Sequence, residues 1–428
     1  MKTNPPIVVR SDLAPNFTRA LGQHLATART HQRTQPAIAM PLVEDAIAHR
    51  VSDIHVEPQT SNARIRFRID GAVCDVAHTE REAAQLLINQ FKAMAGLDPI
   101  IRFTPRDAHA HVITESTPTD LRLALTPCQS GEALSLRILD ARRLERSIDN
   151  LGLSQENLSR LEVWLENVKG MFLASGPTGA GKTTTVYSLL HELKYNDRTI
   201  VSLEDPVEYQ IDGITQVPLD EKHHFNFAEG VKAMLRLDPD YIMLGEIRDG
   251  GSAHAAVNAA ISGRVLLSTI HSRDAVGTLT ALRNWGLADH QIAESLTVVV
   301  AQRLVRKLCE HCRRRSKPDP TEAAWLHSFG LTPPRVAWKP VGCDKCNKLG
   351  YFGRTGIFEF WQLDGTDYEM ILSHRNEHDM RDHLASRGHQ SLLVNGLAKV
   401  NGGVTSIEEL RRMSGGVIPA LQGVARGR

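Results

Sequence analysis

The stretch "GPTGAGKTTT", residues 176–185, decides the fold of this chain. It follows the apolar run "MFLAS" and opens a segment of helical pattern, which is the strand, loop and helix order that the phosphate-binding motif G-x-x-x-x-G-K-[ST] requires. Glycines let backbone N–H groups close around a phosphate where a side chain would clash, and the helix N-terminus favours an anion. The stretch therefore predicts a site for a nucleoside triphosphate.

The motif gives individual residues of the loop a role. Lys182 is expected to reach the β- and γ-phosphates, and the hydroxyl group of Thr183 is expected to bind Mg²⁺. ATP and Mg²⁺ are therefore the predicted ligands of this segment. The residues predicted to bind ATP are Gly176, Pro177, Thr178, Gly179, Ala180, Gly181, Lys182, Thr183 and Thr184.

Apolar strands alternate with helical stretches through residues 151–300. The strands are expected in "GMFLASG", "TIVSLED", "YIMLGEI" and "VLLSTIH". Such alternation is typical of a parallel sheet with helices on both faces. The predicted fold is therefore α/β, with the phosphate-binding loop at the carboxyl edge of the sheet.

Polar side chains follow three of these strands. Glu246 in "YIMLGEIRD" is predicted to be the general base or to lie in the Mg²⁺ shell, and Glu204 in "SLEDPVEY" to position the attacking water. Asp205 and Glu208 are equally compatible with a solvated turn. His271 ends "LLSTIH" and is either a γ-phosphate sensor or a structural residue.

Four of the six cysteines form two C-x-x-C pairs. Two such pairs place four thiolates around Zn²⁺, and the residues between the pairs are expected to form a helix in "TEAAWLHSF". A redox pair is the alternative. The predicted zinc ligands are Cys309, Cys312, Cys343 and Cys346.

Composition excludes some classes of protein. The net charge is +1, so no global field attracts nucleic acid, and direct binding of nucleic acid is not expected. No apolar run reaches the ~18–20 residues that span a bilayer. The protein is expected inside the cell, soluble or bound to a membrane through other proteins.

The chain of 428 residues divides by pattern into several segments. Residues 1–36 are expected to be a mobile arm with one short helix around Phe17–Thr27, and 141–150 a polar linker. The remaining predicted domains are a small α+β (PAS-like) domain at 37–140 and an ATPase domain at 151–428, which includes a zinc subdomain at 305–358 and a helical tail at 364–428.

With these motifs in hand, the chain resembles the GspE/PilB-type assembly ATPases of type II secretion and type IV pili. The resemblance rests on "SDIHVEP", "RIRFRIDG", "LEDPVEY", "LRLDPDYIMLGEIRD", "VAQRLVRKLCEHC", "CDKC" and "GRTGIFEF" together with the phosphate-binding loop. It implies a RecA-like core and a homo-hexameric motor in the cytoplasm. The motor would act on a polytopic inner-membrane platform protein and other secretion or pilus assembly components. Because retraction motors of this superfamily lack the zinc insert, the resemblance favours filament extension or secretion.

The resemblance also implies residues that one subunit lends to the nucleotide of another. Arg122 in "LRLAL" matches one such arginine, with Arg66 and Arg68 as weaker candidates. The chain departs from the family at His109, where an arginine is usual, and at Arg264, where a histidine is usual. The family usually carries a large recruitment domain before the small domain, so recruitment is expected to use another surface here.

Three other functions remain open from the sequence. His109 and Arg264 suggest a structural hub that binds ATP and hydrolyses it weakly. A DNA-acting RecA-like ATPase can also carry zinc, although the near-neutral charge argues against it. A motor for a DNA-uptake fibre would share every motif above.

Overall fold

The computed structural model describes residues 10–29, 37–114, 117–139, 147–194, 197–219, 225 and 227–414. The chain separates into two compact units, Met1–Arg143 and Leu144–Arg428. Parts of the predicted arm, linker and helical tail fall on residues outside the described ranges. Each unit is built around its own sheet.

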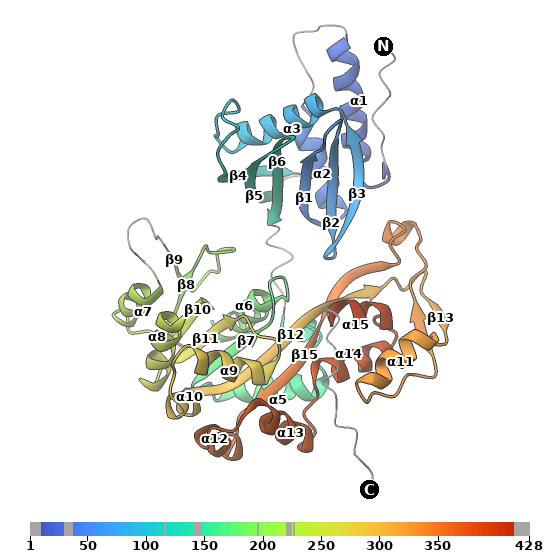
Figure 1. Ribbon diagram of the computed structural model, residues 1–428. Coiled ribbons are helices and arrows are strands. Elements are labelled where there is room, and N and C mark those ends of the chain that lie inside the picture. Colours follow the sequence, from blue (N-terminus) through green and yellow to red (C-terminus); the bar gives the residue numbers. More distant parts are fainter. Residues whose placement is uncertain are drawn as a thin grey trace. The chain divides into compact units, whose positions relative to one another are not determined.

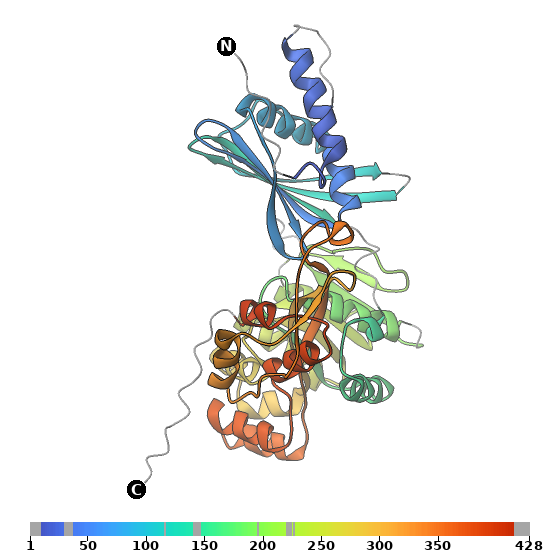
Figure 2. The ribbon, with the colours of Figure 1, turned by 90° about the vertical axis from the view of Figure 1, so that its right-hand side faces the viewer.

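Unit 1 is an antiparallel sheet with helices on one face (Figures 1 and 2). In β2 the side chains alternate, so that Ile65 and Phe67 are buried while the arginines between them lie on the other face. The strand order is β3-β2-β1-β6-β5-β4. The elements are α1 (Pro15–Arg29), α2 (Ala39–Ala48), β1 (Val51–Pro58), β2 (Ala63–Ile69), β3 (Ala72–Thr79), α3 (Arg81–Met94), β4 (Arg106–Thr114), β5 (Thr117–Cys128) and β6 (Gly131–Leu139).

Helix α1 lies in the segment that the sequence predicts to be an arm. Phe17 and Leu21 are fully buried, and the carboxylate of Asp45 in α2 accepts hydrogen bonds from the backbone N–H of Phe17, at 2.8 Å, and from the side chain of Asn16, at 2.9 Å. An apolar side chain on every third or fourth residue gives this helix a face that α2 covers. Residues 10–29 are thus a packed part of unit 1.

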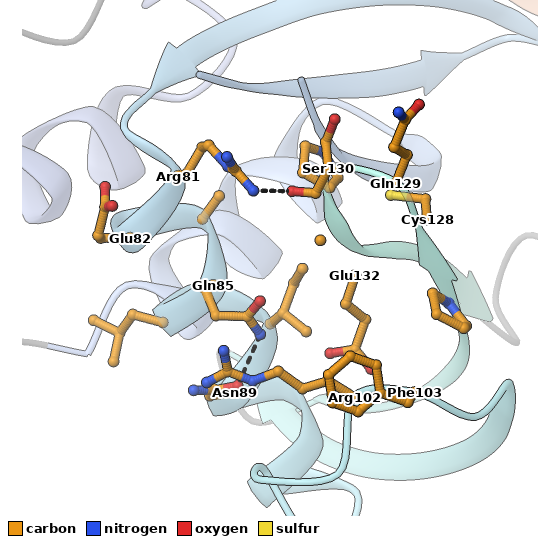
Figure 3. Close-up of a pocket in the computed structure, with 16 residues that line it drawn as sticks. Arg81, Glu82, Gln85, Asn89, Arg102, Phe103, Cys128, Gln129, Ser130 and Glu132 are labelled. Carbon is orange, nitrogen blue, oxygen red and sulfur yellow. Dashed lines mark hydrogen bonds between the residues drawn. The ribbon is translucent and has the colours of Figure 1, made fainter. Parts of the chain in front are cut away.

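A cavity of about 850 Å³ opens between α3 and the β5–β6 turn of unit 1 (Figure 3). Arg81 donates to the carbonyl of Ser130 across it, and Glu132 lines it. Glu132 forms a 2.6 Å ion pair with Lys92, and both side chains are almost fully buried. Breaking one member of such a pair leaves an uncompensated charge, so the pair ties α3 firmly to the sheet.

Unit 2 is built on a seven-stranded sheet in the order β15-β12-β7-β11-β10-β8-β9 (Figure 1). All neighbours are parallel except β15, which runs antiparallel to β12. Its first elements are η1 (Ile148–Asn150), α5 (Gln155–Glu166), β7 (Met171–Ser175), α6 (Lys182–Leu193), β8 (Ile200–Glu204), β9 (Thr215–Pro218), α7 (Phe227–Leu235), β10 (Tyr241–Ile247), α8 (Gly250–Ile261), β11 (Val265–Ile270), α9 (Ala275–Asn284), α10 (Asp289–Ser295) and β12 (Leu296–Leu308). They are followed by β13 (Arg314–Ser316), α11 (Pro320–Ser328), β14 (Ala337–Lys339), η3 (Asp344–Cys346), β15 (Tyr351–Gln362), α12 (Gly365–Leu372), α13 (Glu377–Ser386), α14 (Leu392–Asn401) and α15 (Ile407–Met413).

The sheet of unit 2 has a hydrophobic core on each face. Phe172 and Leu267 pack with α5 and α6, whereas Leu173 and Leu266 pack with α7 to α10. Strands buried on both faces read as continuous apolar runs, which is why the sequence predicts this sheet well. The predicted α/β fold is confirmed, and the carboxyl ends of β7, β10 and β11 meet at one edge, where ligands bind in such sheets. No helix in the described ranges is long and apolar enough to cross a membrane.

Candidate nucleotide site and metal centre

The loop between β7 and α6 has the conformation that its glycines allow. The φ angles of Gly176, Gly179 and Gly181 are +151°, +76° and +88°, a region that other residues rarely adopt. A Cβ atom on Gly176 would lie 2.6 Å from the carbonyl oxygen of Gln302, so no side chain fits there. Gln302 also donates to the carbonyl of Ala180 at 2.8 Å and thereby holds the loop from β12, a role that the sequence reasoning missed.

Lys182 is folded onto this loop. Its Nζ atom donates to the carbonyls of Gly176 at 2.8 Å and Pro177 at 3.3 Å, and lies 3.5 Å from Nδ1 of His271. Burial lowers the pKa of Lys182 to about 8; Glu246 opposes this shift and Arg303 adds to it. The ammonium group is therefore held at the loop by weak neutral acceptors, which phosphate oxygens can replace with charge-assisted hydrogen bonds.

Glu246 meets His271 at the carboxyl ends of β10 and β11. Nε2 of His271 lies 2.5 Å from one carboxylate oxygen of Glu246, and Nε of Arg248 donates to the other at 2.8 Å. Arg248 also donates to Asp205 at 3.1 Å, so Asp205 belongs to this group of charges. The structure brings the predicted residues Lys182, His271 and Glu246 together. Arg248 was missed, although its place two residues after Glu246 puts it on the same side of an extended chain.

Glu204 takes part in a different set of contacts. Its buried carboxylate accepts hydrogen bonds from Ser202 at 2.6 Å, from Gln216 at 3.1 Å and from the hydroxyl of Tyr187. Burial raises the pKa of Tyr187, and the neighbouring Glu204 raises it further, so the tyrosine stays a donor. The three donors belong to β8, β9 and α6. None of these hydrogen bonds connects Glu204 to Glu246 or His271.

The arginines predicted to reach a neighbouring nucleotide lie on one face of the sheet in unit 1. Arg122 of β5 pairs directly with His109 of β4 on one side and with Arg137 of β6 on the other. Arg137 and Arg68 both contact Asp53, at 3.1 and 3.3 Å. Because directly paired residues point to the same side of a sheet, these side chains form a single row on the face opposite the helices. His109 thus stands beside Arg122 in that row.

The other departure, Arg264, lies away from the nucleotide loop. It precedes β11, whereas His271 follows it, so the two are separated by six strand residues, or roughly 20 Å. The guanidinium of Arg264 contacts Asp238 at 3.7 Å and Ser262 at 3.2 Å. Arg264 therefore makes no contact with the loop of its own chain.

The four predicted zinc ligands form one cluster. All four sulfur atoms lie within 4.8 Å of one another, and three of the pairs are 3.8 Å apart. Four sulfurs placed tetrahedrally at about 2.3 Å from a zinc ion are separated by about 3.8 Å. Backbone N–H groups of Gly342 and Gly350 point at Cys312 and Cys346 from 3.2 Å, which stabilises thiolates. The cluster therefore fits a structural zinc ion.

The cysteine-bearing insert is fastened to the C-terminal helices, and these segments lie together in Figure 2. Leu326 of α11 and Ala337 of β14 share a core with Val400 and Leu410 of α14 and α15. The guanidinium groups of Arg313 and Arg315 lie over the ring of Trp338, 4.7 and 5.1 Å from its centre. The predicted helix between the cysteine pairs is present as α11.

Comparison with known proteins decides the family. The model of the type II/IV secretion system protein family matches residues 28–412. The chain belongs to this family. Type II secretion system ATPase E of Vibrio cholerae is 37% identical over 373 residues, which cover 87% of this chain and 74% of that protein. Type IV pilus assembly ATPase TfpB of Acinetobacter baylyi is 36% identical over 376 residues, which cover 87% and 64%.

Solved structures of an ATPase and of a pilus motor share the fold of this secretion-family chain. The ATPase DotB of Legionella pneumophila superposes with a TM-score of 0.66 at 18% identity, covering 90% of this chain and 97% of DotB. The pilus retraction motor PilT with bound ADP gives a TM-score of 0.59 at 20% identity, covering 87% and 95%. The predicted resemblance to secretion and pilus ATPases is confirmed at the level of the family.

Proposed function

We propose that this chain is an ATP-hydrolysing motor that drives assembly of a type IV pilus or of the pseudopilus of type II secretion. The observation that carries the proposal is the meeting of Lys182, His271 and Glu246 at a phosphate-binding loop. In a member of the secretion-system family, this grouping supplies a phosphate ligand, a sensor and a base in one place. Relatives named as ATPases of type II secretion and pilus assembly support the same reading.

The hydrolytic step can be written with the residues of this chain. Lys182 exchanges the carbonyls of the loop for the β- and γ-phosphate oxygens, and Thr183 would hold Mg²⁺, which when bound would neutralise phosphate charge. Glu246 takes a proton from water as the water oxygen bonds to the γ-phosphorus and the bond to the β-phosphate oxygen breaks. ADP and inorganic phosphate leave. Arg248 fixes the direction of the Glu246 carboxylate, and His271 reports the γ-phosphate.

Two further residues are proposed to take part in this step. Glu204 would position the attacking water, and to do so it exchanges the hydrogen bond from Tyr187 for one from water. Arg122 would contact the nucleotide of another subunit, since its row on unit 1 presents several positive charges on one face. Such sharing requires an oligomer, and we propose a homo-hexamer.

The cysteine-bearing insert favours assembly over retraction, because retraction motors of the superfamily lack it. Its hydrophobic core is shared with α14 and α15, which suits a stiff element of the motor. We propose that the motor works at the cytoplasmic face of the inner membrane. It would be held there by a polytopic platform protein and other assembly components.

The test uses the purified full chain. Its oligomeric state and its rate of ATP hydrolysis are measured with and without the platform protein. We expect a zinc-loaded hexamer whose ATP hydrolysis is lost in Lys182→Ala. A hexamer that binds ATP and never turns it over, even beside its platform protein, would instead support a nucleotide-gated structural hub. Stimulation by single-stranded DNA would point to a DNA-acting ATPase.

The affinity for ATP is expected to fall as the pH rises through 8. Phosphate binding favours charged Lys182, whose pKa is about 8 in the free protein, and the groups facing it are Glu246, His271 and Arg303. The KM for ATP should therefore rise about tenfold between pH 7 and pH 9. Lys182→Arg keeps its charge over this range and should show a flat profile. A flat profile in the unmodified protein would contradict the role given to Lys182.

A further inference from the structure

Arg303 lies against the phosphate-binding loop, and nothing above gives it a role. Strands β7 and β12 run parallel with Ser175 paired to Ala301, so Arg303 comes just past the end of β7. A Cβ atom on Gly176 would lie 3.1 Å from Nη1 of Arg303. The Arg303 side chain is partly buried. It therefore packs on the first residue of the loop.

Arg303 joins its own strand, β12, which lies beside the phosphate-binding loop, to the segment that follows β11. Nη1 donates to the carbonyl of the preceding residue, Gln302, at 2.8 Å, and Nη2 donates to the carbonyl of Arg273 at 2.6 Å. Arg273 stands two residues after His271, in the segment between β11 and α9. A guanidinium group presents several donors in a rigid plane, so it can hold both carbonyls at a fixed separation. A lysine ammonium lacks that fork.

Two carboxylates balance the charge of Arg303. Asp274 and Glu359 both attract it, while burial lowers its pKa. Asp274 is itself fixed, because it caps α9 by accepting from Gly277 at 2.8 Å and pairs with Arg381 of α13 at 2.6 Å. The carboxylate of Glu359 accepts from the backbone N–H of Ala275 at 3.3 Å. The segment after β11 is thus held from both sides by charged contacts.

We propose that Arg303 is a positioning residue for ATP hydrolysis, which fixes the segment bearing His271 against the phosphate-binding loop. This inference rests on the proposed function. Arg303 acts through other groups, because its donors are directed at two backbone carbonyls. Its loss should therefore disturb the alignment of His271 and Glu246 more than it disturbs the hold on the nucleotide.

The test compares Arg303→Lys and Arg303→Gln in the full chain by steady-state ATPase kinetics. For Arg303→Lys we expect kcat to fall about 10- to 100-fold, the effect of a misplacement near 1 Å, with the KM for ATP at pH 7 changed less than about threefold. Arg198→Gln is the matched control. Arg198 pairs with Asp240 at 2.8 Å on the exposed surface, so this substitution should leave both constants unchanged.

The charge of Arg303 gives a second measurable effect, the pH at which the KM for ATP rises. A merely structural role of Arg303 would leave this pH unchanged. Arg303→Gln removes a positive group near Lys182, so the alkaline rise of KM should move to higher pH by about half a unit or more. Arg303→Lys keeps the charge and should not move it. The KM for ATP is compared above pH 8, because burial and Asp274 raise the pKa of Glu359 to about 7. Above pH 8 the charge of Glu359 no longer changes with pH.

Several results would overturn the inference. The first is a wild-type kcat in Arg303→Lys. The second is an alkaline rise of KM that stays at the same pH in Arg303→Gln. The third is a KM for ATP that rises by the same factor as kcat falls in Arg303→Lys. If Arg303→Gln does not fold, as judged by its melting curve, Arg303→Lys alone decides. If the unmodified chain shows no turnover, the proposed function fails by itself. The loss of affinity at high pH is then measured by equilibrium binding of a fluorescent ATP analogue, which still tests the effect of Arg303 on Lys182.

Discussion

Glu246→Gln is expected to lower kcat for ATP hydrolysis by about 10²- to 10⁴-fold, the contribution typical of a general base. The substitution keeps the size of the side chain and an oxygen that can accept from Arg248, so the site should keep its shape. It removes the carboxylate that we propose takes the proton of the attacking water. Binding of ATP should persist, because the phosphate ligands lie on the loop and on Lys182.

The measurement is a steady-state ATPase assay, with equilibrium nucleotide binding run in parallel. Glu229→Gln is the control. Glu229 lies on the exposed surface of α7, where it pairs with Lys232 at 2.8 Å, and its loss should leave turnover intact. If Glu246→Gln retains wild-type kcat, Glu246 is not the base. Glu204→Gln then becomes the decisive variant, because Glu204 is the other carboxylate predicted for this step.

Cys343→Ser is expected to reduce bound zinc from about one ion per chain to nearly none. Cys343 lies 3.8 Å from the sulfurs of both Cys309 and Cys346, so its loss removes one of the four sulfur atoms that would surround the ion. We expect zinc affinity to fall by more than about 100-fold, the upper range for loss of an outer contact alone. Without the ion, the insert should lose its fixed structure, since metal binding and local folding are linked in such sites.

Metal content and amide hydrogen exchange measure this effect together. Exchange should rise in residues 305–358 and also in α14 and α15, because the insert shares a core with those helices. Cys128→Ser is the control, as this exposed cysteine lies in unit 1, outside the cluster. A purified wild-type chain without zinc, with the same exchange rates in the Cys343→Ser variant, would instead favour the redox alternative. The insert would then no longer favour an assembly motor over a retraction motor.

Some features of the site could be predicted because their signals are local in the sequence. The conformation of the loop follows from its glycines, and Lys182 from its place at the start of α6. The cluster of the four cysteines, our predicted zinc ligands, follows from the spacing within each pair and from thiolate chemistry. Glu246 and His271 could be predicted to meet because the carboxyl ends of parallel strands share an edge.

Other features depend on contacts between segments distant in the sequence. Arg303 reaches the loop only because β12 pairs with β7, and Glu359 reaches Arg303 only because β15 pairs with β12. Helix α1 is packed rather than a free arm because α2 covers its apolar side, which a short polar segment does not reveal. Glu204 reads like Glu246 in the sequence, yet Tyr187 and Gln216 enclose it.

The sequence by itself determined the α/β fold, the phosphate-binding loop, the cluster of four cysteines and the family, because each rests on residues whose spacing along the chain carries the chemistry. Only the tertiary structure decided which charges act together. It set His109 beside Arg122, separated Arg264 from the loop and surrounded Arg303 with two carboxylates. The physical reason is that strand order and register bring together residues that are separated along the chain, and electrostatic interactions depend on distance in space.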